Sequence, residues 1–454
     1  MKCTLHNLGC KVNSYETEAM RQLLEAAGYE IVEFGSETAD VYIINTCTVT
    51  NIADRKSRQM LHKAKKDNPN AVVVAAGCYV QEAGEKLLAD EAVDIIVGNN
   101  RKGQIVEVLE EYFKGRNIDN SFIDINKTRE YENLEINASL AHTRAYIKIQ
   151  DGCNQFCTYC IIPFARGRVR SRKIEDIIDE VRKLAESGCH EIVVTGIHLS
   201  SSGLDFDNTE YNAQPVPNAE RLLQVLEAIA AVDGIDRIRL GSLEPRIITD
   251  TFLERLSAIP QICPHFHLSL QSGCDETLKR MNRRYDTEEF REGVEKIRRY
   301  FDKPAITTDV IVGFPGETDE EFAITRKYLE EINFFEMHVF KYSRRKGTIA
   351  DRMENQIADS VKSERSDALI ELDEELSRAY RESFAGSAEV VLVEEYVECD
   401  GIKYAVGHTK RYVKVYISLD CAQEQDIKIN AEIPVIITGI FGKDSVISKV
   451  AIAN

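Results

Sequence analysis

The chain has 454 residues, of which 57 are basic and 75 acidic, so its net charge at pH 7 is −18. At roughly 150 residues per domain, this length predicts about three domains. The acidic balance argues against a protein that coats nucleic acid through its overall charge, although a local basic groove is compatible with it. Residues 1–13 lack the basic start and apolar run of a signal peptide. The longest apolar stretch, Ala71–Ala76, is far below the roughly 20 residues that span a bilayer, so we expect a cytoplasmic protein without membrane contact.

Twelve cysteines require an explanation in such a protein. A reducing cytosol disfavours stable disulfides, so grouped cysteines are better interpreted as metal ligands or catalytic thiols. Six of the twelve lack partners at ligand spacing, and we assign them no role: Cys3, Cys189, Cys263, Cys274, Cys399 and Cys421.

Residues 1–125 alternate short apolar runs with helical patterns, which is typical of a parallel sheet covered by helices. The predicted strands are 3–8, 41–45 and 71–76, and each is followed by a cysteine: Cys10, Cys47 and Cys78, here called the N-terminal triad. Because all strands of such a sheet point one way, the three cysteines should meet at its carboxyl edge, where these folds bind ligands. The alternative is three small buried apolar side chains. We favour a shared site, because two of the cysteines follow a glycine that permits close backbone approach.

A polar stretch from about residue 114 to 140 is interpreted as a linker, and a second series of strands and helices occupies residues 140–385. Its predicted strands are 145–150, 191–195, 237–241, 265–270, 306–312 and 336–342. Six repeats suggest an open, partial (βα)6 barrel, since closure normally takes eight strands. Chemistry in such a barrel belongs at the carboxyl ends of the strands.

Residues 386–454 show alternating runs rich in β-branched residues, with little helical periodicity: 389–393, 412–417, 433–437 and 445–452. This pattern is typical of a small β-barrel. The expected fold class is therefore α/β, with an N-terminal parallel-sheet domain (1–125), a central partial barrel (140–385) and a C-terminal β-barrel (386–454).

The strongest motif is DGCNQFCTYC, residues 151–160, here called the cluster loop. It places Cys153, Cys157 and Cys160, the loop triad, directly after the first predicted barrel strand. Three thiolates can hold three irons of a 4Fe-4S cube and leave the fourth iron open to a substrate's amine and carboxylate. A zinc site would normally have four ligands in paired motifs, and a ferredoxin would use a fourth nearby cysteine. Neither pattern is present here.

The spacing CxxxCxΦC, with Tyr159 at the aromatic position, resembles the cluster loop of the radical S-adenosylmethionine (SAM) superfamily. The resemblance implies that the loop triad holds a 4Fe-4S cluster at which SAM is cleaved reductively, with Tyr159 near the adenine. Other strand ends resemble SAM contacts of that superfamily: Thr195, Gly196, Ser269, Gln271, Ser272, Asp309 and Gly313. We add Glu244 as a polar contact near a predicted strand end. His198, Arg283 and His338 are also near strand ends, but such residues are more often structural hydrogen-bonding groups.

The two triads and the C-terminal barrel together resemble the methylthiotransferase family over nearly the whole chain. The resemblance implies that the N-terminal triad holds a second 4Fe-4S cluster, which handles sulfur and receives a methyl group from one SAM. A second SAM then supplies a 5′-deoxyadenosyl radical that activates an unreactive carbon. An electron donor such as flavodoxin or ferredoxin is also implied.

Members of this family modify adenosine 37 of tRNA or an aspartate of a ribosomal protein. The runs LGCKVNSYE (8–16) and TCTVTNIADRKSRQ (46–59) resemble the branch acting on C2 of N6-threonylcarbamoyladenosine 37. After the first cysteine, the isopentenyladenosine branch tends to have Gln-Met-Asn and the protein-modifying branch Pro-Lys-Asn, where this chain has Lys11-Val12-Asn13. The alternatives are isopentenyladenosine 37, a ribosomal-protein aspartate, or a non-catalytic RNA-binding or electron-carrying protein.

Two basic groups are candidate tRNA contacts. Four arginines alternate just after the cluster loop, and an extended strand would aim them all the same way, toward phosphates: Arg166, Arg168, Arg170 and Arg172. The C-terminal module resembles a TRAM domain, a small RNA-binding barrel, with Lys410, Arg411 and Lys414 as its basic patch and Tyr412 for stacking. That module is acidic overall, which would also suit a basic protein substrate. The run YSRRKGT (342–348) departs from the family's usual YSPRPGT.

Overall fold

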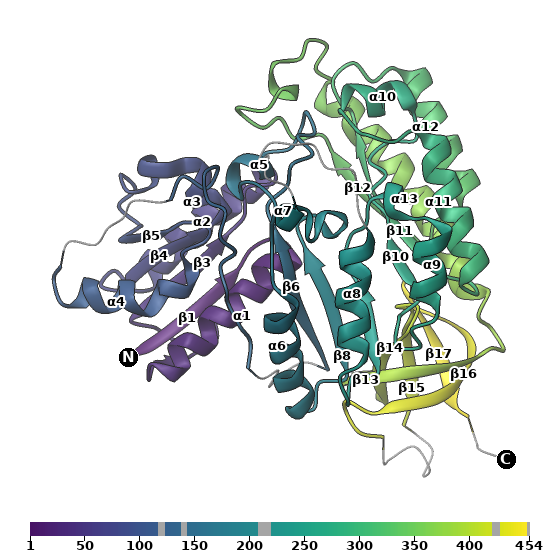
Figure 1. The fold of residues 1–454 in the computed structure, drawn as a ribbon, viewed down its shortest axis with the longest axis horizontal. Helices are drawn as coiled ribbons and strands as arrows, with labels where there is room; N and C mark the ends of the chain where they lie inside the picture. Colours follow the sequence, from purple (N-terminus) through teal and green to yellow (C-terminus); the bar gives the residue numbers. More distant parts are fainter. Residues whose placement is uncertain (117–122, 138–142, 208–218, 420–426, 452–454) are drawn as a thin grey trace.

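Three bodies of secondary structure make up the protein (Figure 1). The computed structural model describes residues 1–116, 123–137, 143–207, 219–419 and 427–451. An N-terminal α/β body lies beside a central half-barrel, and a small β-barrel sits beneath the half-barrel in this view. The predicted α/β fold class is confirmed. Parts of the predicted linker, 117–122 and 138–142, fall outside the described residues.

The N-terminal body is a five-stranded sheet in the order β2-β1-β3-β4-β5, with every pair parallel. Its strands are β1 (Lys2–Asn7), β2 (Glu30–Ile31), β3 (Val41–Thr46), β4 (Val72–Gly77) and β5 (Ile95–Val97). Helices α1 (Lys11–Ala26) and α4 (Ile105–Phe113) cover one face, and α2 (Asn51–Asp67) and α3 (Cys78–Ala83) cover the other, with short 3-10 turns η1 (Gly84–Leu87) and η2 (Lys102–Gln104). The chain order reverses between β1 and β3, which is where doubly wound sheets bind ligands.

Helix α1 packs against two bodies at once. Its Met20 and Leu24 join the core of the N-terminal sheet, whereas Tyr15 and Ala19 join the core of the half-barrel. The helical period puts these two pairs on different faces of one helix. Helix α1 therefore lies between β1 and β6, as Figure 1 shows, and fixes the N-terminal sheet to the half-barrel.

Six parallel strands form the half-barrel, as predicted from their spacing. They are β6 (Arg144–Asp151), β8 (Glu191–Gly196), β9 (Arg237–Leu240), β10 (His265–His267), β11 (Ala305–Val312) and β12 (Glu336–Lys341), with β7 (Arg170–Ser171) antiparallel to β6. Single bridges, Ile238 to Ile262 and Leu243 to Leu268, join the β6-β8-β9 half to the β10-β11-β12 half. Strand β10 ends earlier than predicted, because the chain leaves the ladder before Gln271, whose φ is +74°.

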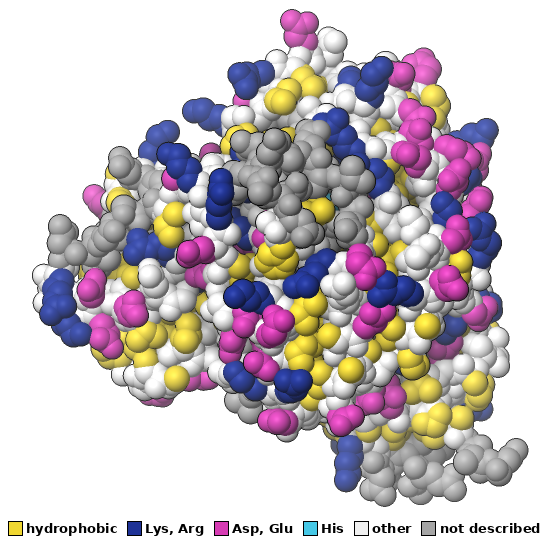
Figure 2. All heavy atoms as spheres, in the orientation of Figure 1, with side chains coloured by type: hydrophobic (Ala, Val, Ile, Leu, Met, Phe, Trp, Pro, Cys, Tyr) yellow, Lys and Arg dark blue, Asp and Glu magenta, His cyan; other side chains and the backbone are white. Residues whose placement is uncertain are grey.

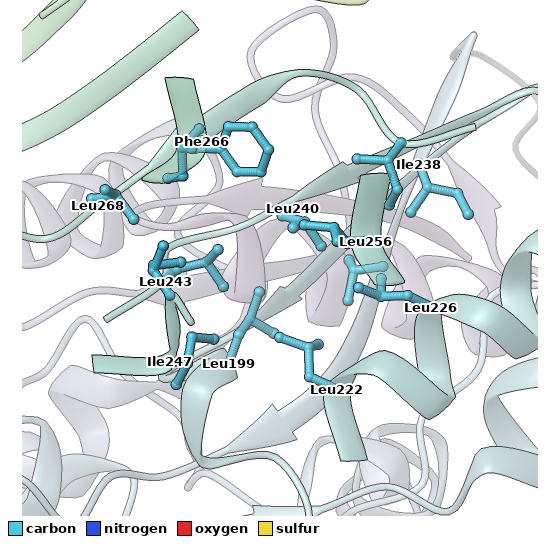
Figure 3. Close-up of a cluster of buried hydrophobic side chains, with 14 of the residues drawn as sticks. Leu199, Leu222, Leu226, Ile238, Leu240, Leu243, Ile247, Leu256, Phe266 and Leu268 are labelled. Carbon is cyan, nitrogen blue, oxygen red and sulfur yellow. The ribbon is translucent and has the colours of Figure 1, made fainter. Parts of the chain in front are cut away.

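Helices cover the outside of the half-barrel. They are α5 (Ile162–Ala165), α6 (Ile174–Glu186), α7 (Leu204–Asp207), α8 (Ala219–Ala230), α9 (Asp250–Ser257), α10 (Asp275–Arg280), α11 (Thr287–Tyr300), α12 (Asp319–Ile332) and α13 (Asp359–Glu382), with turns η3 (Leu199–Ser201), η4 (Pro245–Ile247) and η5 (Ala350–Arg352). Figure 3 shows the core between them, where leucines of α8 and α9 meet Ile238, Leu240 and Phe266. Among the described helices, none is both long and apolar enough to cross a membrane.

The C-terminal body is a closed barrel in the order β13-β14-β15-β17-β16. Its strands are β13 (Ala388–Cys399), β14 (Ile402–Thr409), β15 (Lys414–Ser418), β16 (Glu432–Phe441) and β17 (Ser445–Val450). The barrel sits on the amino ends of the central strands, where the Arg237 guanidinium donates to the carbonyl oxygen of His408 at 3.1 Å and that of Arg239 to the carbonyl oxygen of Lys410 at 3.1 Å. The half-barrel is thus capped at its amino end, opposite the predicted chemistry.

A buried charge network joins the N-terminal sheet to the half-barrel. The carboxylate of Glu16, on α1, contacts Lys102, Lys148 at 3.0 Å and Arg166 at 2.9 Å, and all four side chains are at most 1% exposed. Asp151 adds a second carboxylate, 3.1 Å from Arg166. Burial alone would raise the pKa of Glu16, but the surrounding cations hold it well below its usual range. The network is therefore ionised and depends on both bodies.

Replacing Glu16→Gln should lower the free energy of unfolding by about 3–5 kcal/mol, because it leaves buried cations without their shared anion. Urea unfolding followed by circular dichroism measures this. The matched control is Glu25→Gln on the same helix, whose ion pair with Arg21 is half-exposed and should contribute about 0.5 kcal/mol or less. Equal losses in the two variants would contradict a structural role for the network.

Acid should lower the stability of the protein by protonating another buried carboxylate, that of Glu191. Despite the opposing effect of burial, Arg239, Arg144 and Arg237 lower the pKa of Glu191 to about 2. A carboxyl group whose pKa is depressed on folding stabilises the protein above its unfolded pKa of ~4.3, and this stabilisation is lost as the pH falls toward the folded value. The melting temperature should therefore fall between pH 5 and pH 3. A constant melting temperature over that range would contradict the expectation.

Candidate functional site

The structure brings the N-terminal triad together at the carboxyl edge of the first sheet, as predicted. Cys10 is the N-cap of α1, Cys47 follows β3 and Cys78 begins α3. A Cβ on Gly9 would lie 3.0 Å from the Cys47 Sγ, so a side chain there would intrude on the thiol. Burial, together with the neighbouring thiols of Cys78 and Cys10, raises the pKa of Cys47 to about 12. The three sulfurs are near enough to act on one another.

Two asparagines of the N-terminal body lie beside this triad and contact the half-barrel. Asn13, one turn into α1, donates to the carbonyl oxygens of Leu8 at 2.7 Å and Thr46 at 3.0 Å, and accepts from Arg166 at 2.6 Å. The side-chain amide of Asn99 lies 3.5 Å from the Cys78 Sγ and donates to the carbonyl oxygen of Ala165 at 2.7 Å. The first triad is thus held against the segment that follows the cluster loop.

The backbone of the cluster loop adopts positive φ angles at two positions and is held by hydrogen bonds from neighbouring segments. Gly152 has a φ of +71°, and a Cβ on it would lie 1.9 Å from the carbonyl oxygen of Arg168. Phe156 has a φ of +51°, and its carbonyl oxygen accepts from the Asn282 amide at 3.1 Å. The Cys153 amide donates to the Gly167 carbonyl oxygen at 3.0 Å. The loop is therefore fixed in shape by its surroundings.

The loop triad suits a 4Fe-4S cluster by the chemistry of its donors. Three thiols come from one loop, and burial together with Cys157 raises the pKa of Cys160 to about 12. Iron binding would replace the thiol protons, so it removes the cost of burying thiolates. Arg283 donates from Nη1 to the Cys157 Sγ at 3.2 Å, as a hydrogen bond to a cluster sulfur would require. The motif spacing carries no sign of Arg283, which comes from the segment after α10.

Three of the predicted SAM-binding residues line one cavity of about 200 Å³: Tyr159, Gln271 and Asp309. The same cavity is lined by Val49 and Thr50, which follow Cys47 in the N-terminal body. Because Tyr159 is next to Cys160, the cavity lies between the two triads. This arrangement is the central feature of the site.

Glu244 lies after β9, at the N-cap of η4, and contacts several other polar groups. Its carboxylate is 3.1 Å from the His198 Nε2 and accepts from the Gln155 amide of the cluster loop at 3.2 Å. Burial opposes ionisation, but His198 and Arg246 lower the pKa of Glu244 to about 2. His198 was not predicted as a site residue, because one histidine near a strand end carries little information by itself.

The other predicted SAM-binding residues differ in their surroundings. Thr195 and Gly196 end β8, and a Cβ on Gly196 would lie 3.0 Å from the Gln150 Oε1, so a larger residue would crowd Gln150. The carbonyl oxygen of Ser269 accepts from Tyr285. The Ser272 hydroxyl is buried 3.3 Å from Thr325 of α12, and a Cβ on Gly313 would point at Lys362 of α13, so neither residue is among those that line the cavity. These two positions face helices.

The predicted arginine stripe is wrong for three of its four members. Arg166, Arg170 and Arg172 are at most 2% exposed and pair with buried carboxylates, Arg172 with Glu180. The strand that would have aligned them is short, since β7 covers two residues. Arg168 is half-buried, with its guanidinium 4.5 Å above the ring of Phe156. These arginines hold the cluster loop and the domain interface, so phosphate contact by the buried three is excluded.

The predicted patch of the C-terminal barrel also needs correction. The Lys410 ammonium donates to the Pro260 carbonyl oxygen at 3.0 Å, and Arg411 donates to Glu389 and to carbonyl oxygens of residues 302 and 303. Tyr412 lies in a turn before β15, with a φ of +66°, and its ring faces Arg239 at 4.6 Å. These groups make contacts between domains. On the face shown in Figure 2, Lys and Arg side chains are interspersed with Asp and Glu side chains.

The run YSRRKGT joins the two triad-bearing bodies. The Ser343 hydroxyl accepts from the Asn51 backbone amide at 3.0 Å, and the Asn51 side chain donates to the Arg344 carbonyl oxygen at 2.9 Å. The Arg345 guanidinium donates to Thr48 at 2.7 Å and to Asp54 at 2.5 Å. Both partners follow Cys47 closely. The run therefore forms one wall of the cavity. The sequence alone did not predict this role.

Comparisons with known proteins agree with this geometry. Residues 147–329 match the model of the radical SAM superfamily, and residues 2–98 match the model described as uncharacterized protein family UPF0004. The threonylcarbamoyladenosine tRNA methylthiotransferase MtaB of Bacillus subtilis is 43% identical over 90% of this chain and 89% of its own length. The chain belongs to the radical SAM methylthiotransferase family.

Other relatives define the breadth of the match. The MtaB protein of Aquifex aeolicus is 39% identical, covering 87% of this chain and 93% of its own, and a tRNA-2-methylthio-N(6)-dimethylallyladenosine synthase of the same organism is 36% identical, covering 87% and 88%. The solved radical SAM methyltransferase TsrM of Kitasatospora setae has a TM-score of 0.55 at 14% identity, covering 77% of this chain and 73% of its own. That likeness shows the fold of this methylthiotransferase. Membership of the radical SAM superfamily implies one 4Fe-4S cluster and SAM.

Substituting Gly152→Ala should abolish productive folding of the cluster loop, because the new methyl group would collide with the Arg168 carbonyl oxygen. Misplacing the loop by about 1 Å should lower 5′-deoxyadenosine formation from SAM by about 100-fold or more. The control is Gly188→Ala, which also has a positive φ, +88°, but open space around the Cβ position. Similar 5′-deoxyadenosine yields from the two variants would contradict this role for Gly152.

Proposed function

We propose that this enzyme methylthiolates C2 of N6-threonylcarbamoyladenosine at position 37 of tRNA. The observation that carries the proposal is the cavity between the two cysteine triads, lined by residues that adjoin Cys47 on one side and Cys160 on the other. A base placed there would be within reach of both. The match to MtaB over almost its full length supports the same substrate.

The N-terminal triad is proposed to hold a second 4Fe-4S cluster. Its three thiols equal the loop triad in number, with Cys47 and Cys78 buried and Cys10 exposed at the edge of the sheet. With both clusters and SAM bound, the site would supply a 5′-deoxyadenosyl radical beside a sulfur donor. An aromatic C–H offers no acidic proton, so ordinary acid-base chemistry would not activate C2.

The chain's own residues prepare the site. Arg283 donates to a cluster-loop sulfur, Glu244 orients the His198 imidazole and the Gln155 amide, and Arg345 holds the loop after Cys47 in place. Tyr159 is packed 6.4 Å from Phe314, which keeps its ring beside the cavity. These contacts fix the positions of the groups that line the cavity.

Other expected partners remain part of the proposal. Of the basic residues predicted to contact tRNA, four keep side chains that are partly exposed: Arg168, Lys410, Arg411 and Lys414. A reductant such as flavodoxin or ferredoxin is proposed as the electron donor, because reductive cleavage of SAM consumes an electron. A tRNA substrate would place the enzyme in the cytoplasm.

Replacing Cys10, Cys47 and Cys78 together by Ala should halve the iron content of the reconstituted enzyme, from about eight to about four per chain. The variant should still form 5′-deoxyadenosine but no methylthio product, since its loop triad is intact. Cys399→Ala, in the C-terminal barrel, is the control and should keep the full iron content. Four irons in the unaltered enzyme would rule out the second cluster.

Mass spectrometry of tRNA nucleosides from cells with and without this gene tests the substrate. Loss of the methylthio group from threonylcarbamoyladenosine on deletion is the expected result. Loss from isopentenyladenosine instead would support the activity for which the 36% identical Aquifex aeolicus synthase is named. An unchanged tRNA profile with an unmodified ribosomal-protein aspartate would support a protein substrate.

A further inference from the structure

The rim of the cavity between the triads carries large apolar side chains that are about half-exposed. Val49 and Phe340 line the cavity and are nevertheless 49% and 47% exposed. Ile349 is 55% exposed, and the amide of the next residue, Ala350, donates to the Thr158 carbonyl oxygen of the cluster loop at 2.8 Å. Apolar side chains gathered at the opening of a site mark a surface that a partner covers.

Two segments form this rim, and hydrogen bonds hold them together. Residues 46–58 lead into α2, and residues 340–352 include the end of β12 and the run that follows it. The Asn51 side chain donates to the Arg344 carbonyl oxygen at 2.9 Å and accepts from the Arg345 guanidinium at 2.9 Å. The cavity rim is therefore one surface to which the N-terminal body and the half-barrel both contribute.

The two rim segments are basic, although the chain as a whole is acidic. Together they hold eight basic residues and two acidic ones, whereas the whole chain has 57 basic and 75 acidic residues. Both acidic residues are engaged in ion pairs, Asp54 with Arg345 at 2.5 Å and Asp351 with Arg344 at 2.7 Å. A basic surface on an acidic chain favours a polyanion over a basic protein segment as the partner.

Arg55 and Lys346 are the cations best placed to reach such a partner. Arg55 lies one turn beyond Asn51 on α2, so it is on the side of the helix that faces residues 340–352. Lys346 follows Arg345 in the run that joins the two bodies. The side chains of Arg55 and Lys346 are both exposed, so their charges are available to a molecule that lies over the cavity.

A single-stranded loop of RNA matches this combination of groups. Exposed aromatic rings stack on unpaired bases, and cations beside them contact the phosphates that link those bases. A base that enters the cavity must first leave the stack of its own loop. The ring of Phe340, at the opening, would then provide a new stacking surface, and the phosphates on either side of the base would lie over the rim.

We propose that the cavity rim binds the anticodon loop of the tRNA. Phe340 stacks on an unpaired base of the loop, and Arg55 and Lys346 contact phosphates that flank the target base. The inference rests on the proposed function and extends it, because it names the surface that receives the RNA. That surface replaces the buried arginines and the interdomain contacts of the C-terminal barrel as the main tRNA contact.

The test of stacking measures the binding of a fluorescently labelled anticodon stem-loop with threonylcarbamoyladenosine to holoenzyme without reductant. Phe340→Leu keeps an apolar side chain but removes the ring, so it should weaken binding about tenfold or more. Phe340→Tyr should bind as the unaltered enzyme does. The control is Phe113→Leu on α4, whose ring is 46% exposed and should contribute nothing.

The test of phosphate contact measures the same binding over a range of salt concentrations. Arg55→Gln combined with Lys346→Gln should make the slope of log Kd against log salt shallower by about 1.4, since each phosphate contact on a single strand contributes about 0.7. Phe340→Leu should leave the slope unchanged. The control, Lys66→Gln combined with Lys327→Gln, removes two exposed charges at the far end of α2 and on α12 and should keep the slope.

Iron content and melting temperature, measured for each variant, show whether it folds as the unaltered enzyme does. Among folded variants, unchanged RNA affinity in Phe340→Leu or an unchanged salt slope in the Arg55 and Lys346 double variant would overturn the inference. Weaker SAM binding without RNA in Phe340→Leu, with full RNA affinity, would also overturn it, because the ring would then belong to the SAM site.

A protein partner at the rim would give a different result. The unaltered enzyme would then bind a peptide around the ribosomal-protein aspartate more tightly than the stem-loop, and this outcome too would overturn the inference. Failure of the proposed function is distinct from all of these. In that case the stem-loop would bind with the expected dependence on the cavity rim, but the unaltered enzyme would form no methylthio product on it after reduction.

Discussion

The buried carboxylate of Glu16 is the constraint on which the two-body site depends. It belongs to the helix that begins at Cys10, and its partners Lys148 and Arg166 belong to the half-barrel that carries the cluster loop. Burying such charges is costly unless every partner is present, so the network specifies one relative placement of the two bodies. The distance between the triads is set by the same contact, because Arg166 also holds Asn13 beside the first triad.

Strand order and polarity made much of this site predictable. Parallel strands bring post-strand residues to one edge, so the convergence of Cys10, Cys47 and Cys78 followed without any informative spacing. The loop triad was predicted from local spacing alone. Both predictions use rules that act within one sheet or one loop. Predicting the cavity between the bodies would have required their relative placement, which neither rule gives.

The arginines after the cluster loop show the limit of local reasoning. Alternation predicts a common face only if the segment is one extended strand, and Gly167 breaks it with a φ of +74°. The partners of Arg166 and Arg172 include Glu16, 150 residues away, and Glu180 on the following helix. Neither partner is marked by the alternation of the arginines, so the pattern gives no sign of burial. Arg283 and Arg345 were missed for the same reason, since their contacts form only in the folded chain.

The double role of helix α1 has a consequence for how this enzyme can be divided. Tyr15 and Ala19 contribute to the core of the half-barrel although they belong to the N-terminal body. A fragment ending before the half-barrel would expose these apolar side chains together with Glu16, whose buried partners Lys148 and Arg166 would be absent. The bodies are separate in sequence but interdependent in folding. Chimeras between relatives should therefore exchange α1 and its half-barrel contacts as one unit.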